Sequence, residues 1–243
     1  MNLLSLLQLS DPALPIGGYA HSGGLETYVQ AGIVCDPASA GNFVRELLRT
    51  SVHYTDAALV ALAFKAVVSE DEEELAGLDR LCEAVKLPRE MREASRKLGG
   101  RLGKIFEGSV GLGSGGKDGV GGMNEAGCWI SEGSVGASDG RFRCPRHYPV
   151  AFGYCAARLR IGLREALTGY YYNAAAGMVT NCVKLIPMGQ QDGQVLLFSL
   201  QSLIKELVEK SLEPDRELIG MCCVGLDIRC MQHEQLYSRL YMS

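Results

Sequence analysis

The sequence predicts an all-α fold, a single helical bundle of about eight to ten helices of ordinary length. Apolar residues recur at three- and four-residue spacing through most of the chain, and helix-starting residues precede several of these stretches. The period-two alternation of strands is nowhere sustained. With 243 residues the chain can bury one large core. We therefore expect one domain over residues 1–243.

The N-terminal half contains three helix-starting signals. Asp36 and Pro37 occupy the positions of an N-cap and a first helical residue, where the missing backbone N–H of proline costs nothing. Ser69 and Glu72 form a predicted capping box ahead of the next helix. Pro88 is expected to start a third helix. The basic residues that follow in "PREMREASRKLGGRLGK" are interleaved with glutamates, which favours a solvated helix face.

Two further helices are predicted in the C-terminal half. The first covers "GLREALTGYYYNAAAGMVTNCVKLI" and is ended by Pro187. The second covers "DGQVLLFSLQSLIKELVEKSL" and has one apolar face. The residues of that face are Leu196, Leu200, Leu203, Ile204, Leu207 and Val208.

A glycine-rich segment separates the two halves. More than a third of the residues from Gly108 to Gly140 are glycine, so we expect a flexible insertion at about 108–144. It contains a near match to a phosphate-binding loop, with Lys117 at the lysine position. Asp118 follows where Ser or Thr would bind magnesium, and no buried strand precedes the loop. Nucleotide binding is therefore not expected here.

Composition argues against several classes of function. The net charge of −4 gives no bulk attraction for nucleic acid or an anionic membrane. No uncharged apolar stretch reaches the roughly 18 residues that indicate a membrane span. The nine cysteines are an odd number, and the opening "MNLLSLLQLSDPALP" lacks the basic region of a secretory signal. We expect reduced thiols and a soluble, cytoplasmic protein.

No catalytic constellation emerges from the sequence. His233 and Glu234 resemble half of a zinc protease motif, but Tyr237 stands where the second histidine would be. The cysteines form no C-x-x-C pair, and Ser22 beside His21 lacks the spacing of a nucleophile and its base. His21 and His233 could still meet in space. We predict no catalytic residue, no bound metal and no cofactor for this chain.

Three segments instead have the character of binding surfaces. Near the start, a Pro/Gly turn presents Tyr19 ahead of a helix that is expected to begin near Ser22. Lys184 precedes the break at Pro187, although it could serve only to neutralise the end of its own helix. The chain ends in "MQHEQLYSRLYMS", an apolar and aromatic tail that would lower its free energy by contacting a partner.

These three segments resemble the UreF family of urease accessory proteins. The matching text is "LLQLSDPALPIGGYAHSGGLETYVQ", "NCVKLIPMGQQDGQ" and "MQHEQLYSRLYMS", and the similarity covers about residues 3–107 and 145–243. The departure is the glycine-rich run, because members of the family have helix-forming sequence between the two halves.

The resemblance implies an all-α homodimer that catalyses no reaction of its own. It implies binding to the accessory protein UreD, also called UreH, and recruitment of the GTPase UreG, so that nickel is delivered to apo-urease. Nickel and GTP would be handled by the partner complex. By motif position, Tyr19 and Arg239 are the expected UreG contacts, and Glu26 and Lys184 match further positions of that face. The tail implied to contact UreD includes His233, Tyr237, Leu240 and Tyr241.

Two alternatives remain open at this point. One is a small metal-dependent helical enzyme that uses His21, His233 and a carboxylate such as Glu26 or Glu234. The other is a helical dimer whose tail only closes its own subunit interface.

Overall fold

The computed structural model describes residues 2–109, 144–221 and 223–242, and it confirms the all-α prediction, because the described residues contain no strand. The glycine-rich insertion expected at about 108–144 lies, for residues 110–143, outside the described residues. The elements before it are α1 (Leu3–Leu9), η1 (Gly18–Ala20), α2 (Leu25–Gln30), α3 (Pro37–Leu47), η2 (Leu48–Ala57), α4 (Ala58–Val68), α5 (Glu72–Val85) and α6 (Arg89–Ser109). Those after it are α7 (Tyr148–Arg158), α8 (Leu163–Leu185), α9 (Gln190–Ser199), α10 (Gln201–Ser211), η3 (Arg216–Leu218) and α11 (Val224–His233).

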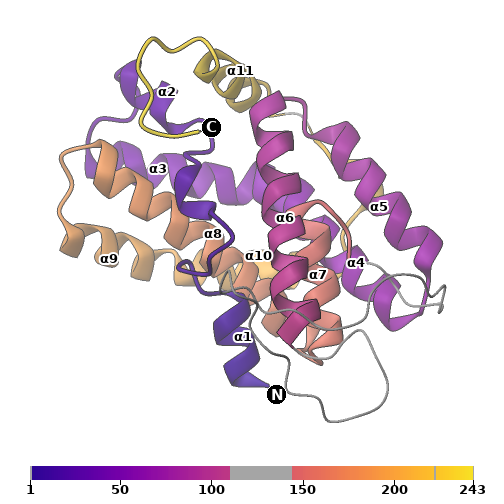
Figure 1. The fold of residues 1–243 in the computed structure, drawn as a ribbon. Helices are drawn as coiled ribbons and strands as arrows, with labels where there is room; N and C mark the ends of the chain where they lie inside the picture. The colour runs from indigo at the N-terminus through magenta and orange to yellow at the C-terminus, as the bar shows by residue number, and fades with distance from the viewer. Residues whose placement is uncertain (1, 110–143, 222, 243) are drawn as a thin grey trace, which may run out of the picture.

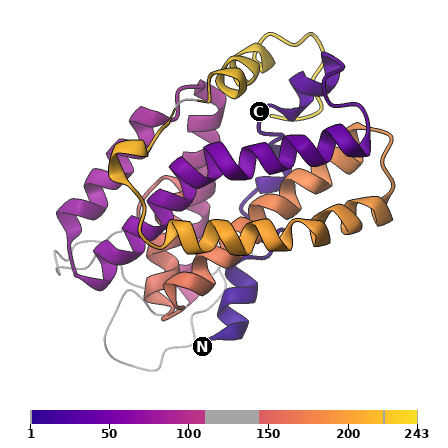
Figure 2. The same cartoon turned by 180° about the vertical axis from the view of Figure 1, so that it is seen from behind.

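The longest element is a continuous helix over Pro37–Val68, made of α3, the π-helical segment η2 and α4. Asp36 caps it as predicted: its Oδ1 accepts the backbone N–H of Ser39 at 2.8 Å. Figure 2 shows this helix running beside α9 and α10. By length and composition the helix could cross a membrane, but 61% of its most apolar window is buried inside the protein, as in the core helix of a soluble domain.

The core is centred on the pairing of α4 with α7. Eight of the 11 residues of α7 are buried. Gly153 lets the two helices approach so closely that a Cβ at this position would meet the backbone of Val60 and the Cβ of Ala63. Helix α8 completes the core with the fully buried side chains of Leu167 and Tyr171. Figure 1 shows the N- and C-termini at opposite ends of this helical body.

The structure corrects three sequence-based boundaries. Helix α5 is capped by Asp71, which accepts the N–H of Glu74 at 2.9 Å, whereas the Ser69 hydroxyl donates to a carbonyl at the end of α4. Helix α2 begins at Leu25 rather than near Ser22, because two glycines with positive φ precede it. The predicted helix through Leu200 is divided there into α9 and α10.

Candidate partner-binding site

The three segments selected from the sequence meet at the end of the molecule that contains the C-terminus (Figure 1). The backbone N–H of Met242 donates to the carbonyl of Ala20 at 2.9 Å. The side-chain amide of Asn181, one turn before Lys184 in α8, donates to the carbonyl of His21 at 2.9 Å. Residues that are far apart in the sequence therefore form one surface.

The loop that presents Tyr19 is fastened to α6. Arg101 donates a hydrogen bond from Nη1 to the carbonyl of Ile16 at 2.8 Å. Gly17 lies beside this guanidinium with φ +90°, so a side chain here would be strained and would collide with Arg101. The fixed turn leaves Tyr19 69% exposed.

Helix α2 brings Glu26 into the interior next to α11. Gly24, with φ +84°, precedes α2, and a Cβ on it would lie 2.7 Å from the Sγ of Cys230. Only glycine permits this close approach of the two helices. The approach buries Glu26 to 5% exposure, although it is charged and lies in a first helical turn.

Glu26 holds the tail through backbone hydrogen bonds. Its Oε1 accepts the N–H of Leu240 at 2.8 Å, and its Oε2 accepts the N–H of Tyr241 at 3.1 Å. Gln30, one turn later in α2, donates to the carbonyl of Ser238 at 3.2 Å. The tail is therefore docked along α2 rather than left in solvent.

His233 and Arg239 add charged contacts to the same anchor. The two ring nitrogens of His233 face two carboxylates, with Nδ1 2.7 Å from Glu90 and Nε2 3.2 Å from Glu26. Arg239 donates from Nη1 to the other oxygen of Glu90 at 2.8 Å. Helices α2, α6 and α11 and the tail are joined by this network.

The predicted binding residues divide into an exposed and a buried group. Tyr19, Lys184, Tyr237 and Leu240 are exposed, and Arg239 is partly exposed, with 40% of its side chain accessible. Glu26, His233 and Tyr241 are buried, and they contact the tail or hold it from within. Burial, and after it the Glu26 carboxylate, raises the pKa of Tyr241.

Two features were missed by sequence reasoning. Glu90 lies in the stretch interpreted as a solvated helix face, yet its side chain is only 14% exposed and binds both His233 and Arg239. The outer face of α11 carries an exposed apolar stripe, which we call the α11 stripe. Its members are Met221, which precedes the helix, and Val224, Ile228 and Met231 within it. The spacing of the last three is helical, a signal the sequence does contain.

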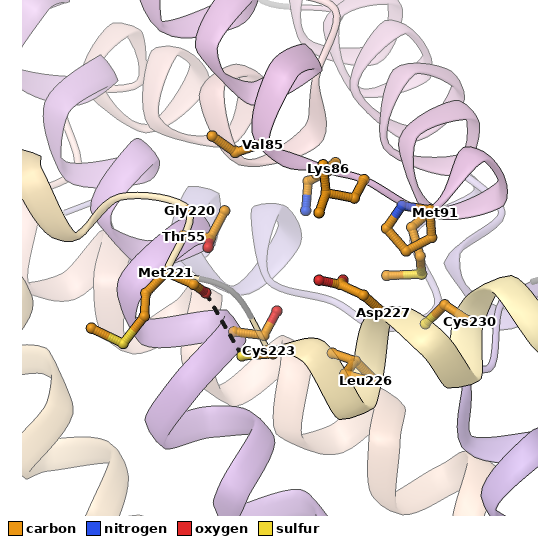
Figure 3. A pocket seen from close by; sticks show the side chains of 13 residues that line it. Thr55, Val85, Lys86, Met91, Gly220, Met221, Cys223, Leu226, Asp227 and Cys230 are labelled. Carbon is orange, nitrogen blue, oxygen red and sulfur yellow. Dashed lines mark hydrogen bonds between the residues drawn. The ribbon is translucent and has the colours of Figure 1, made fainter.

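A small pocket of about 50 Å³ lies between α11 and the segment joining α5 to α6 (Figure 3). Four sulfur-containing side chains line it, those of Met91, Met221, Cys223 and Cys230, together with Lys86 and Asp227. Burial raises the pKa of the Cys230 thiol to about 12, so this thiol is protonated at neutral pH. A cavity of this volume is too small for a substrate.

Within the described part of the chain, no group of three or more His, Cys, Asp or Glu side chains is arranged to hold a metal ion. Glu26 and Glu90 contact opposite nitrogens of the His233 ring, so these groups do not converge on a common point. Burial, followed by the charges of Lys97 and Arg101, lowers the pKa of His21.

Comparison with known proteins identifies the family. The model of the UreF family matches residues 34–201, which is more than half of the chain. A urease accessory protein UreF from Actinobacillus pleuropneumoniae is 43% identical over 239 residues, 98% of each chain. The chain belongs to the UreF family of urease accessory proteins.

Other UreF relatives align over a similar length. A Haemophilus influenzae UreF is 40% identical over 242 residues, covering 100% of this chain and 96% of the relative. A UreF from an Arthrobacter species is 34% identical over 99% of this chain. These relatives are named as accessory proteins and not as enzymes, which argues against a metal-dependent enzyme built on His21 and His233.

Proposed function

We propose that this protein is a cytoplasmic, homodimeric scaffold for urease maturation. In this proposal it binds UreD/UreH and recruits the GTPase UreG, and the complex delivers nickel to apo-urease. The chain itself needs no catalytic group or cofactor, because nickel and GTP are bound by its partners.

One observation carries the proposal: the tail is anchored by polar contacts and by the buried Tyr241, while the side chains of Tyr237, Leu240 and Met242 face solvent. Glu26 and Gln30 hold the backbone, yet Tyr237 is fully exposed and Leu240 is 69% exposed. Ordering a tail costs conformational entropy, and the exposed side chains of Tyr237 and Leu240 gain no compensating burial within the chain. A partner that covers them would provide that burial.

We assign UreD/UreH to the exposed tail and the neighbouring α11 stripe. Both surfaces belong to the last 23 residues of the chain, and both combine exposed methionine, aliphatic or aromatic side chains. Met and Tyr are typical of the fully buried centre of protein interfaces. We assign UreG to Tyr19, Lys184 and Arg239, the adjacent surface with two cationic side chains.

Tyr237→Ala combined with Leu240→Ala tests the UreD assignment. We expect this variant to fold normally but to weaken UreD binding by about 2 kcal/mol or more, roughly thirtyfold in affinity. Tyr172→Ala, which removes a 44% exposed tyrosine from α8, is the matched control and should bind as the parent does. Affinity is measured by titration with purified UreD.

Two results would contradict this assignment. Unchanged UreD affinity in the double variant would exclude the tail as the contact. A loss of dimerisation with UreD binding intact would instead show that the tail closes the subunit interface. Adding UreG, nickel and GTP to the parent protein and UreD then establishes which complexes form.

A further inference from the structure

The exposed face of α6 has three basic side chains that we call the basic row: Lys97, Arg101 and Lys104. They are separated by four and three positions, so they lie on one side of the helix, and all three are exposed. At a rise of about 1.5 Å per residue, the row extends for about 10 Å along α6. The net charge of the chain is −4, so the basic row is a local region of opposite sign.

Among the described residues, the basic row differs from the other cations of α6 in having no carboxylate partner. Arg89 pairs with Glu234 at 3.2 Å. Arg92 and Arg96 both pair with Glu83 at 3.4 Å. The remaining cations of the helix are those on the exposed face. Because no carboxylate of the described chain neutralises them, their charge is available to a carboxylate of another protein.

The basic row lies beside the loop that presents Tyr19. Arg101 donates to the carbonyl of Ile16, three residues before Tyr19, at 2.8 Å. After burial, the charges of Lys97 and Arg101 are the largest influences that lower the pKa of His21, so both cations also lie near the far end of this loop. The tyrosine and the basic row are therefore parts of one surface.

The basic row also continues toward the C-terminal tail. Glu90 precedes Lys97 by seven positions, two turns of helix, and so lies on the same side of α6. Arg239 pairs with Glu90 at 2.8 Å and is partly exposed. Positively charged side chains thus follow one another from Arg239 along α6 to Lys104, past the loop of Tyr19.

We propose that the basic row is part of the UreG-binding surface and faces a region of the GTPase that is rich in Asp and Glu. This role rests on the proposed function, which assigns UreG to Tyr19, Lys184 and Arg239. Two of those side chains are cationic, and the basic row adds three more cations beside them. UreD is assigned to the apolar α11 stripe and tail, a surface whose chemistry does not call for these charges.

The basic row should act mainly on the rate at which UreG associates. Exposed charges attract a partner of opposite sign before the two surfaces touch, and they raise the association rate constant more than they slow dissociation. Salt screens this attraction. The association of UreG with the complex of this protein and UreD should therefore slow as the salt concentration rises.

Lys97→Glu and, separately, Lys104→Glu test the basic row. Arg101 is left unchanged because it also fixes the Tyr19 loop. Lys205→Glu is the matched control: it reverses an exposed lysine of α10, which lies in front in Figure 2, whereas α6 lies in front in Figure 1. UreG is passed over the immobilised complex with UreD, and the rate constants are measured at low and at high salt.

Each substitution in the basic row should lower the association rate constant of UreG by about threefold to tenfold at low salt. The loss should shrink at high salt, where the charges are screened in parent and variant alike. The control should associate as the parent does. Binding to UreD and the melting temperature should be unchanged in all three variants, because the substituted side chains are exposed.

The outcomes separate the basic row from the proposed function. If the parent complex does not bind UreG, the proposed function fails and the role of the basic row fails with it. If the parent binds UreG but both row variants associate as fast as Lys205→Glu, the proposed function stands and the basic row is overturned. A loss of the same size at low and high salt also overturns it. Weakened UreD binding in the row variants would place UreD on α6 and contradict the assignment to UreG.

Discussion

Lys86 and Asp56 form a nearly buried ion pair where the segment before α6 meets the π-helical segment η2. Nζ lies 2.6 Å from Oδ1, and the side chains are 11% and 19% exposed. Burial alone would lower the pKa of Lys86, but the Asp56 carboxylate together with the neighbouring Cys82 and Cys230 outweighs burial, and the pKa is raised. Lys86 therefore stays cationic at neutral pH, and the carboxylate of Asp56 is its counter-ion.

Lys86→Met should consequently destabilise the protein. It leaves the Asp56 carboxylate buried without its counter-ion, a change that typically costs about 3–5 kcal/mol. Chemical denaturation measures the free energy of unfolding. The double variant Lys86→Met with Asp56→Asn should recover much of the loss, and a single variant as stable as the parent would show that solvent reaches Asp56.

A substitution of Tyr19 distinguishes an effect on partner binding from an effect on folding, because the side chain is exposed. Because its side chain is 69% exposed on a loop fixed by Arg101, Tyr19→Ala should change the free energy of unfolding by no more than about 0.5 kcal/mol. The same variant should fail to recruit UreG to the complex with UreD, as judged by size-exclusion chromatography. A melting temperature far below that of the parent would mean that Tyr19 packs against the fold instead.

At the scale of elements, the contact of α4 with α7 depends on one glycine. Gly153→Ala would raise the helix propensity of α7, yet the added Cβ would meet the Val60 backbone and the Cβ of Ala63. Backbone cannot move aside as a flexible side chain can, so we expect a net destabilisation of about 1–3 kcal/mol.

Gly177→Ala in α8 is the matched control, because a Cβ there meets no atom within 4 Å. It should stabilise the protein by up to about 1 kcal/mol, the difference in helix propensity between the two residues. Thermal unfolding of both variants measures the contrast. If Gly153→Ala were as stable as Gly177→Ala, the packing of α4 on α7 would be looser than the structure has it.

The helices were predictable where a local signal determines them. Asp36 caps α3 and Pro187 follows the end of α8, because each acts on the backbone next to it. Local signals failed where two residues could each have been the N-cap of one helix. Asp71 lies closer to the first turn of α5 than Ser69 does, and the side chain of Asp71 caps the helix. The division at Leu200 follows no glycine or proline, and the periodicity does not indicate it.

The candidate site was predictable in its segments but not in its internal contacts. The Tyr19 turn and the tail were identifiable because their composition is unusual for a loop and a chain end. The buried role of Glu90 was not identifiable from the sequence, because a glutamate among basic residues on a helix has the same local pattern whether it is solvated or buried. Its partners His233 and Arg239 are separated from it by 143 and 149 positions.

At the scale of the whole molecule, burial should determine how fast each cysteine thiol reacts. The structure describes seven cysteines, and no two of these seven form a disulfide with each other. Burial raises the pKa of Cys82, Cys182 and Cys230 to about 12, so at neutral pH almost none of each is thiolate, the nucleophilic form. Cys35, by contrast, is exposed at the start of α3.

Iodoacetamide at neutral pH, followed by peptide mass spectrometry, should therefore modify the exposed Cys35 before the buried Cys82, Cys182 and Cys230. Cys82 and Cys182 lie in the core and should react only when the whole fold opens, with the rate set by global stability. Cys230 lies on the buried side of the short helix α11, whose main contacts with other helices are those with α2 and α6, so this helix can open without unfolding the core. Cys230 should therefore react before the two core thiols. In Glu26→Gln the difference in alkylation rate between Cys230 and the core thiols should be larger, because the contact of Glu26 with His233 in α11 is weakened. Core thiols that react as fast as Cys35 would contradict the packing of α5 and α8.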